Sequence, residues 1–272
     1  MNEEELKKKA RELRKEVIKM LEEAGSGHTA GSLGMADIFA VLYHDHLNIN
    51  PKKPESDDRD IVVLSNGHIC PILYATLADK GFFPKKELKT FRKINSKLQG
   101  HPHRETLPGL ETTSGPLGSG LSQASGIALG LKRDKKSNKV ICLTSDGEHE
   151  EGNTWEAAML AAKYQLSNLT QIIDRNNIQI DGNTEDIMPL NDLKSKYEAF
   201  NWHVQEINGN NVDEIKNALN TTTHVEDKPS VIIAHTTPGK GVSFIENDYK
   251  WHGKPPSEEE AKIALEELDN AQ

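Results

Sequence analysis

The sequence has 272 residues, and 33 lysines and arginines against 42 aspartates and glutamates give it a formal net charge of −9. This acidic balance argues against a nucleic-acid surface or an anionic-membrane surface, so any phosphate would be bound at a local site. The length allows a sizeable core, and we expect a single domain over residues 1–272.

The cysteines and the N-terminus indicate the compartment. Cys70 and Cys142 lie in apolar contexts with no Cys or His at ligand spacing, so we expect buried free thiols in a reducing cytosol. The N-terminus is highly charged, and no apolar run approaches the roughly 18 residues of a membrane span. We therefore expect a cytoplasmic protein without a signal peptide or a membrane span.

Hydrophobic periodicity predicts helices that alternate with strands. Residues 3–24 carry apolar side chains at helical spacing, and a Gly-Ser-Gly run then leaves His28 on a loop expected to reach Gly34. The later elements are expected in this order: helix 35–47, strand 61–64, a helix running to about residue 80, a short basic helix at 84–93, helix 120–131, strand 139–144, a helix after 152, strand 169–174, strand 203–207, helix 211–220, strand 230–235 and helix 257–268. This alternation predicts an α/β fold, a doubly wound, mostly parallel sheet with helices on both faces.

Glycine-rich turns stand out between these elements. The span 95–120 is rich in Gly and Pro, and a loop of this length is unusual in a compact domain unless it is functional. Histidines lie on four such turns: His28, His68, His101 and His252. Taken singly, each is more often a surface or hydrogen-bonded loop histidine than a catalytic one.

A polar turn follows the predicted strand at 139–144, and Asn176 follows the next predicted strand at 169–174. Because the carboxyl ends of parallel strands lie at one sheet edge, Asp146 of that turn and Asn176 should converge at the open edge where ligands bind. Hard oxygen donors of this kind suit Mg²⁺. Gly147 would let the backbone approach a phosphate at the start of the following helix. The alternative is plain turn chemistry, because Asp-Gly and Asn-Asn are common in turns.

This stretch resembles the diphosphate-binding motif of thiamine-diphosphate enzymes, a Gly-Asp-Gly followed further along by Asn, with Ser145 at the position of the first Gly. Together with it, six further motifs occur in the order found in transketolases: Ser26-Gly27-His28, Ser65-Asn66-Gly67-His68, Gly100-His101-Pro102, Thr113–Gly118, Ile180-Asp181-Gly182 and His252-Gly253. They span nearly the whole chain. The sequence as a whole therefore resembles the transketolase family.

The resemblance implies a thiamine diphosphate site with a divalent ion, magnesium or in its place calcium or manganese. Its ligands would be Asp146, Asn176 and the carbonyl of Ile178. The resemblance implies these further cofactor contacts: His68 and Gly147 at the diphosphate, Gly115 and Leu117 at the thiamine, His252 near its reactive ring, and Glu148.

The resemblance also implies a sugar-binding side. His28, His101 and His252 would face the substrate and move protons near neutral pH, which imidazoles do with little pKa tuning. Glu151 and Glu156 stand where the family has acidic residues at the subunit contact that links the cofactors. Acidic residues in the first turn of a helix also stabilise its dipole, which explains them equally well.

Two basic residues and one more histidine lie near these candidates. Arg92 and Lys93 could meet a sugar phosphate, but an exposed basic face explains them better. His103 is the neighbouring alternative to His101, but it lacks the Gly-His-Pro context.

Transketolases transfer a two-carbon ketol unit from a ketose phosphate to an aldose phosphate in the pentose phosphate pathway, and the family has two further domains after this one. One of these is the pyrimidine-binding domain with the glutamate that activates the cofactor. We therefore expect the N-terminal subunit of a split transketolase, completed by a C-terminal partner subunit. Homodimer contacts would then give an α2β2 heterotetramer.

Two alternatives stay open. One is another thiamine-diphosphate enzyme, such as a 1-deoxyxylulose-5-phosphate synthase or the α chain of a 2-oxo-acid dehydrogenase, and His101 and His252 argue against it. The other is a non-catalytic, cofactor-holding assembly subunit.

Overall fold

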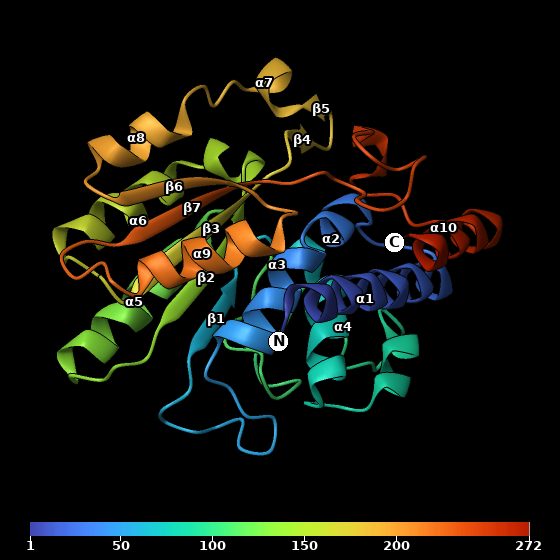
Figure 1. Cartoon of the computed structure of the whole chain (residues 1–272), viewed down its shortest axis with the longest axis horizontal. Helices are drawn as coiled ribbons and strands as arrows, with labels where there is room; N and C mark the ends of the chain where they lie inside the picture. The colour runs from blue at the N-terminus through green and yellow to red at the C-terminus, as the bar shows by residue number, and fades with distance from the viewer. Residues whose placement is uncertain (272) are drawn as a thin grey trace.

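The computed structural model describes residues 1–271. Its centre is a five-stranded sheet in the order β1-β2-β3-β7-β6, in which every neighbouring pair is parallel (Figure 1). The strands are β1 (Ile61–Leu64), β2 (Val140–Ser145), β3 (Leu169–Arg175), β6 (His203–Asn208) and β7 (Ser230–His235). The first three are buried along their whole length, as expected of parallel strands that are covered on both faces.

Helices cover both faces of this sheet (Figure 1). They are α1 (Glu3–Ala24), α2 (Ala30–Gly34), α3 (Ala36–Val41), α4 (Cys70–Lys80), α5 (Ser119–Arg133), α6 (Gly152–Lys163), α7 (Thr184–Ile187), α8 (Leu193–Ala199), α9 (Val212–Thr222) and α10 (Glu258–Asn270). Because successive strand residues point to opposite faces, Val62 and Leu64 join the core beneath α1, α3, α4 and α9. Ile61 and Val63 join the core beneath α5, α6 and α8. The predicted doubly wound, mostly parallel fold is confirmed.

Short elements complete the chain. They are a π-helical turn η1 (Leu42–His46), the 3₁₀ helices η2 (Gly67–Ile69), η3 (Lys85–Thr90), η4 (Gly147–Glu150) and η5 (Tyr249–Trp251), and a small antiparallel hairpin of β4 (Ile178–Gln179) and β5 (Gly182–Asn183). The short basic helix expected at 84–93 is the 3₁₀ helix η3. The hairpin, α7 and α8 were not predicted.

The first helix ends where the site begins. It starts with a capping box, in which Asn2 Oδ1 accepts from the Glu5 N–H at 2.8 Å and Glu5 Oε2 accepts from the Asn2 N–H at 2.9 Å. It ends at Gly25, whose φ of 60° is the left-handed conformation that glycine adopts at low cost. The chain then turns back toward the sheet with His28.

The loop predicted from residue 29 to Gly34 is wrong, because residues 30–34 form the buried helix α2. Its carbonyls find distant partners, since Arg14 Nε donates to the Leu33 carbonyl at 3.0 Å and Asn210 Nδ2 donates to the Gly34 carbonyl at 2.9 Å. A Cβ on Gly31 would lie 3.0 Å from Ile69 Cγ2. The glycines therefore allow close packing and do not mark a loop.

Other expectations can be compared directly with the fold. Cys70 and Cys142 are buried and free, as predicted. Within residues 1–271, no helix is long and apolar enough to cross a membrane. The segment 91–118, between η3 and α5, contains no strand. The Tyr74 hydroxyl anchors it to α4 by donating to the Gln99 carbonyl at 2.9 Å.

Candidate active site

Asp146 lies directly after β2 and is fully buried. Its Oδ1 accepts from the Gly147 N–H at 2.7 Å, and its Oδ2 accepts from the Asn177 N–H at 2.7 Å and from Arg175 Nη1 at 3.1 Å. Burial raises the pKa of Asp146, and the Arg175 guanidinium acts against that rise. The Arg175 guanidinium and two backbone N–H groups therefore enclose the Asp146 carboxylate at this sheet edge.

Asn176 follows β3 at the same sheet edge. Its Oδ1 accepts from the Ile178 N–H at 3.0 Å, and its Nδ2 donates to Asp174 Oδ2 at 2.8 Å. Asp174 is buried, also accepts from the Thr236 hydroxyl, and has its pKa raised by burial to about 7. We did not predict a role for Asp174 from the sequence. The sequence signal for such a role was the position of Asp174 two residues before Asn176, because residues i and i+2 of an extended strand lie on the same side.

The carbonyl of Ile178 is the third predicted oxygen donor, after Asp146 and Asn176. The Asn177 carbonyl accepts from the Thr184 N–H at 3.0 Å, so Asn177 and Thr184 form a hydrogen-bonded pair of the hairpin. Hydrogen-bonded and non-hydrogen-bonded pairs alternate along antiparallel strands, so the backbone N–H and C=O of Ile178 point away from β5. The Ile178 N–H accordingly bonds to Asn176. Within residues 1–271, no three His, Cys, Asp or Glu side chains are grouped to hold a metal. A divalent cation would thus need this mixed set with phosphate oxygens, which suits a hard ion such as Mg²⁺.

Glu148 is fully buried two residues beyond Asp146. Its carboxylate accepts from the Gly118 N–H at 2.5 Å, from the Ser145 N–H at 3.2 Å and from the Ser65 hydroxyl. Ser65 in turn accepts from the Gly120 N–H at 2.9 Å. Glu148 therefore ties together the ends of β1 and β2 and the start of α5, which places Gly147 at a fixed position.

Three imidazoles gather at the same edge. The ring centroids of His28 and His68 are 4.9 Å apart, those of His28 and His252 are 5.4 Å apart, and those of His68 and His252 are 5.1 Å apart. Burial lowers the pKa of His28 to about 4 and also lowers the pKa of His68 and of His252. All three imidazoles are therefore neutral at pH 7, and they come from separate parts of the chain.

The 95–120 segment brings His101 and Gly115 to this cluster. Burial lowers the pKa of His101, and a Cβ on Gly115 would lie 4.0 Å from the His101 ring. A Cβ on Gly67 would overlap Ser114 Oγ, so the turn before His68 packs directly on this segment. Leu117 is half-buried just before α5. The structure thus brings Gly115, predicted on the thiamine side, next to His101, predicted on the sugar side.

Other candidates lie outside this cluster. Glu151 and Glu156 are exposed at the start of α6 and make no ion pair within the described residues 1–271. Lys93 is exposed and pairs with Glu23 at 2.5 Å, as expected for a basic surface. Arg92 is also exposed, with its guanidinium against Gly100, beside His101. His103 is exposed.

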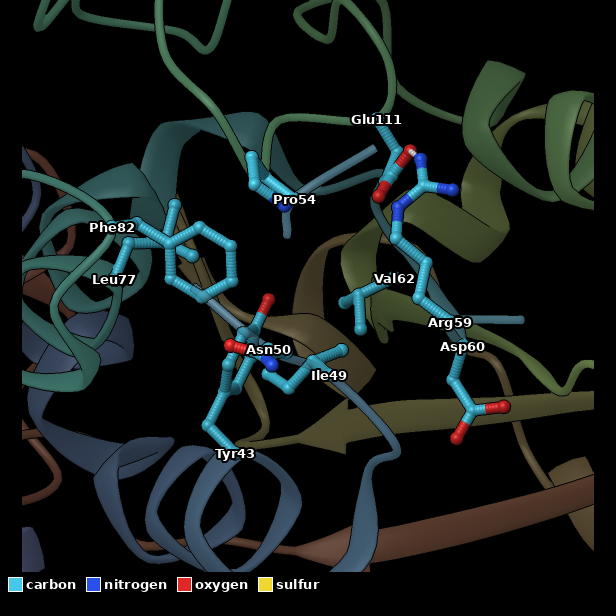
Figure 2. Close-up of a pocket in the computed structure, with 11 residues that line it drawn as sticks. Tyr43, Ile49, Asn50, Pro54, Arg59, Asp60, Val62, Leu77, Phe82 and Glu111 are labelled. Atoms are coloured by element: carbon cyan, nitrogen blue, oxygen red, sulfur yellow. Dashed lines mark hydrogen bonds and ion pairs between the residues drawn. The ribbon is translucent and has the colours of Figure 1, made fainter. Parts of the chain in front are cut away.

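A small cavity lies at the opposite, amino edge of the sheet (Figure 2). It measures about 20 Å³, which is room for roughly one water molecule, and Phe82 and Leu77 face Val62 across it. Arg59 and Glu111 close one side with an ion pair of 2.6 Å. Ligands of open α/β sheets bind at the carboxyl edge, so this cavity is separate from the site.

Comparisons with known proteins give a family match and several similar proteins. Residues 6–269 match the family described as "Transketolase, thiamine diphosphate binding domain". The chain is 39% identical over 268 residues to a subunit of the apulose-4-phosphate transketolase of Phocaeicola vulgatus, covering 98% of this chain and 95% of that protein. It is 40% identical over 265 residues to the 6-deoxy-6-sulfo-D-fructose transketolase subunit SqwG of Clostridium sp. strain MSTE9, covering 97% and 96%.

A solved structure supports the same comparison. The transketolase of Campylobacter jejuni has a TM-score of 0.94 and 38% identity to this chain. The match covers 99% of this chain and 43% of that protein. The chain therefore spans less than half of that transketolase but nearly all of each of the two subunits named above.

Proposed function

Because the chain belongs to the transketolase family, we propose that it is the N-terminal, cofactor-holding subunit of a two-subunit transketolase. With its partner it transfers a two-carbon ketol unit from a ketose phosphate to an aldose phosphate. The observation that carries this proposal is the convergence of two features at one sheet edge. These are the oxygen donors of Asp146 and Asn176 and the neutral imidazoles of His28, His68 and His252.

Thiamine diphosphate and a divalent ion, magnesium or in its place calcium or manganese, fit this edge. Asp146, Asn176 and the carbonyl of Ile178 would hold the ion against the diphosphate. Gly147 has no side chain between its backbone and the diphosphate. Further contacts would come from His68, Gly115 and Leu117. When bound, thiamine diphosphate supplies the electron sink for breaking and forming the carbon–carbon bond.

The chain itself supplies positioning and proton transfer. A neutral imidazole has one N–H donor and one basic nitrogen, so His28, His101 and His252 can each donate to a sugar oxygen or accept a hydroxyl proton. Ring centroids of 5.4 Å or less between His28, His68 and His252 make two neighbouring imidazolium charges unfavourable. The cluster can therefore accept at most one extra proton at a time, which suits stepwise transfer.

A partner protein completes the site in this proposal. Two relatives of nearly the same length are named as transketolase subunits, which supports a separately encoded partner. The partner carries the pyrimidine-binding domain, and homodimer contacts through Glu151 and Glu156 give an α2β2 heterotetramer. The enzyme works in the cytoplasm, in the pentose phosphate pathway.

Reconstitution tests the proposal. Ketol transfer from a panel of ketose phosphates is assayed with this chain, with the C-terminal partner and with both, at saturating thiamine diphosphate and Mg²⁺. We expect activity only from the mixture, with His101→Ala reducing turnover and the neighbouring variant His103→Ala leaving it unchanged. Full activity from this chain alone would contradict the split site. An inactive mixture that still binds the cofactor would favour a non-catalytic assembly role.

A further inference from the structure

Arg175, the last residue of β3, lies between two carboxylates. Its Nη1 is 3.1 Å from Asp146 Oδ2, its Nη2 is 2.6 Å from Glu185 Oε1, and its side chain is 10% exposed. Asp146 follows β2, whereas Glu185 belongs to α7 in the segment 177–191. One guanidinium therefore connects an expected cation ligand to the segment that carries Ile178, another expected ligand.

The hydrogen bonds of Asp146 determine which of its oxygens can face a cation. A carboxylate has about four lone-pair positions, two on each oxygen. Oδ2 accepts from Arg175 Nη1 and from the Asn177 N–H at 2.7 Å, so both of its positions are filled. Oδ1 accepts from the Gly147 N–H at 2.7 Å and keeps one position. Arg175 thus helps to occupy Oδ2 and leaves Oδ1 as the oxygen that can face a cation.

Glu185 fixes the other end of this connection. Its Oε1 also accepts from the Leu190 N–H at 3.2 Å, and its Oε2 accepts from the Asn191 N–H at 3.1 Å. Next to it, the Thr184 N–H donates to the Asn177 carbonyl at 3.0 Å, which closes the hairpin around Ile178. Through Glu185, Arg175 therefore fixes the distance between the Ile178 carbonyl and Asp146.

We propose that Arg175 is a positioning residue that holds two ligands of the cation, Asp146 and Ile178, at a fixed separation. This inference rests on the proposed function, because it assumes that the cation binds at this edge. Mg²⁺ demands near-octahedral geometry at short ligand distances, whereas Ca²⁺ accepts more ligands in flexible arrangements. Loss of Arg175 should therefore impair Mg²⁺-dependent cofactor binding more than Ca²⁺-dependent binding.

Calorimetry of thiamine diphosphate binding to the chain with its partner, in Mg²⁺ and in Ca²⁺, tests this inference. Arg175→Met should weaken binding about tenfold or more in Mg²⁺ and about threefold or less in Ca²⁺, since Ca²⁺ tolerates displaced ligands. Arg175→Lys should not restore Mg²⁺ binding, because one ammonium cannot bridge two carboxylates as a planar fork does. Glu185→Gln should shift the cation preference in the same direction. In the control Lys216→Met, which breaks an ion pair of 3.0 Å to Asp45, binding should stay unchanged.

The outcomes separate a positioning role from a structural one. Equal losses in Mg²⁺ and Ca²⁺ that follow a lowered unfolding temperature would overturn the inference, as would unchanged binding in Arg175→Met. If Arg175→Met does not fold, Arg175→Lys and Glu185→Gln give the same comparison of the two cations. If the wild-type complex shows no cation-dependent binding of thiamine diphosphate, the proposed function itself fails. This failure is distinguishable from failure of the inference about Arg175, because it is seen in the wild-type complex without any variant.

Discussion

Replacing Glu148 by glutamine separates an anchoring role from contact with the cofactor. Glu148 is fully buried, and its carboxylate accepts from the N–H groups of Gly118 and Ser145 and from the Ser65 hydroxyl. Glutamine has nearly the same shape, but one carboxylate oxygen becomes an NH₂ group. At least one buried donor would then face another donor.

The expected cost of Glu148→Gln follows from these contacts. A hydrogen bond to a charged group contributes about 1.5–3 kcal/mol, and a buried donor left without a partner costs about 1–3 kcal/mol. Burial raises the pKa of Glu148, which already offsets part of the benefit of its charge. We therefore expect the free energy of unfolding to fall by about 2–4 kcal/mol, a drop in Tm of about 10 °C for a domain of this size.

Urea denaturation of the wild-type chain and of Glu148→Gln measures this loss. The matched control is Glu150→Gln, because Glu150 is exposed and its carboxylate accepts one long hydrogen bond of 3.4 Å, from Gln179, within residues 1–271. The control should change the free energy of unfolding by less than about 0.5 kcal/mol. A Glu148→Gln variant that keeps wild-type stability but loses affinity for thiamine diphosphate would refute the anchoring role and support the predicted contact of Glu148 with the cofactor.

Three further predictions concern the site and His149, a buried residue of η4. Asp146→Asn should weaken Mg²⁺-dependent thiamine diphosphate binding at least about tenfold by calorimetry, because an amide is a weaker cation ligand than a carboxylate, and unchanged affinity would rule out the metal assignment. His101→Ala and His252→Ala should lower kcat more than they lower cofactor affinity, whereas His68→Ala should lower cofactor affinity more than kcat. Small and equal effects on kcat in steady-state assays and on affinity in binding assays would contradict these roles. Burial lowers the pKa of His149 to about 4, so the unfolded chain binds the extra proton between pH values of about 6.5 and 4. The free energy of unfolding should therefore fall by up to about 3 kcal/mol as the pH decreases through that range, and His149→Gln should flatten part of the slope in urea denaturation.

The order of the elements could be predicted because the buried strands are short β-branched runs bounded by turn residues. β2 and β3 are of this kind, and their position in the chain is enough to place Asp146 and Asn176 at one edge of the sheet. The histidines required more than local pattern, because an isolated His on a glycine turn does not differ from a surface residue. The order of the histidine motifs along the chain, which resembles that of transketolases, indicated that these histidines belong to one site.

Long-range contacts explain what local pattern could not predict. Residues 30–34 have the composition of a loop, but Arg14 and Asn210, from distant parts of the chain, satisfy the carbonyls that end α2. Asp146 is buried because Arg175, from the next strand, fills one side of its carboxylate. Neither contact can be predicted from local hydrophobic periodicity, since each depends on the tertiary packing of elements far apart in sequence.

In the proposed function, the carboxyl edge of the sheet holds a divalent cation and a diphosphate. A crystal structure of this chain with its partner, thiamine diphosphate and Mn²⁺ in place of Mg²⁺ tests it most directly, because Mn²⁺ gives an anomalous signal. We predict a peak about 2.1–2.2 Å from Asp146 Oδ1, Asn176 Oδ1 and the Ile178 carbonyl. A cofactor bound with its cation elsewhere, and with Asp146 still held only by Arg175 and backbone N–H groups, would contradict the claim.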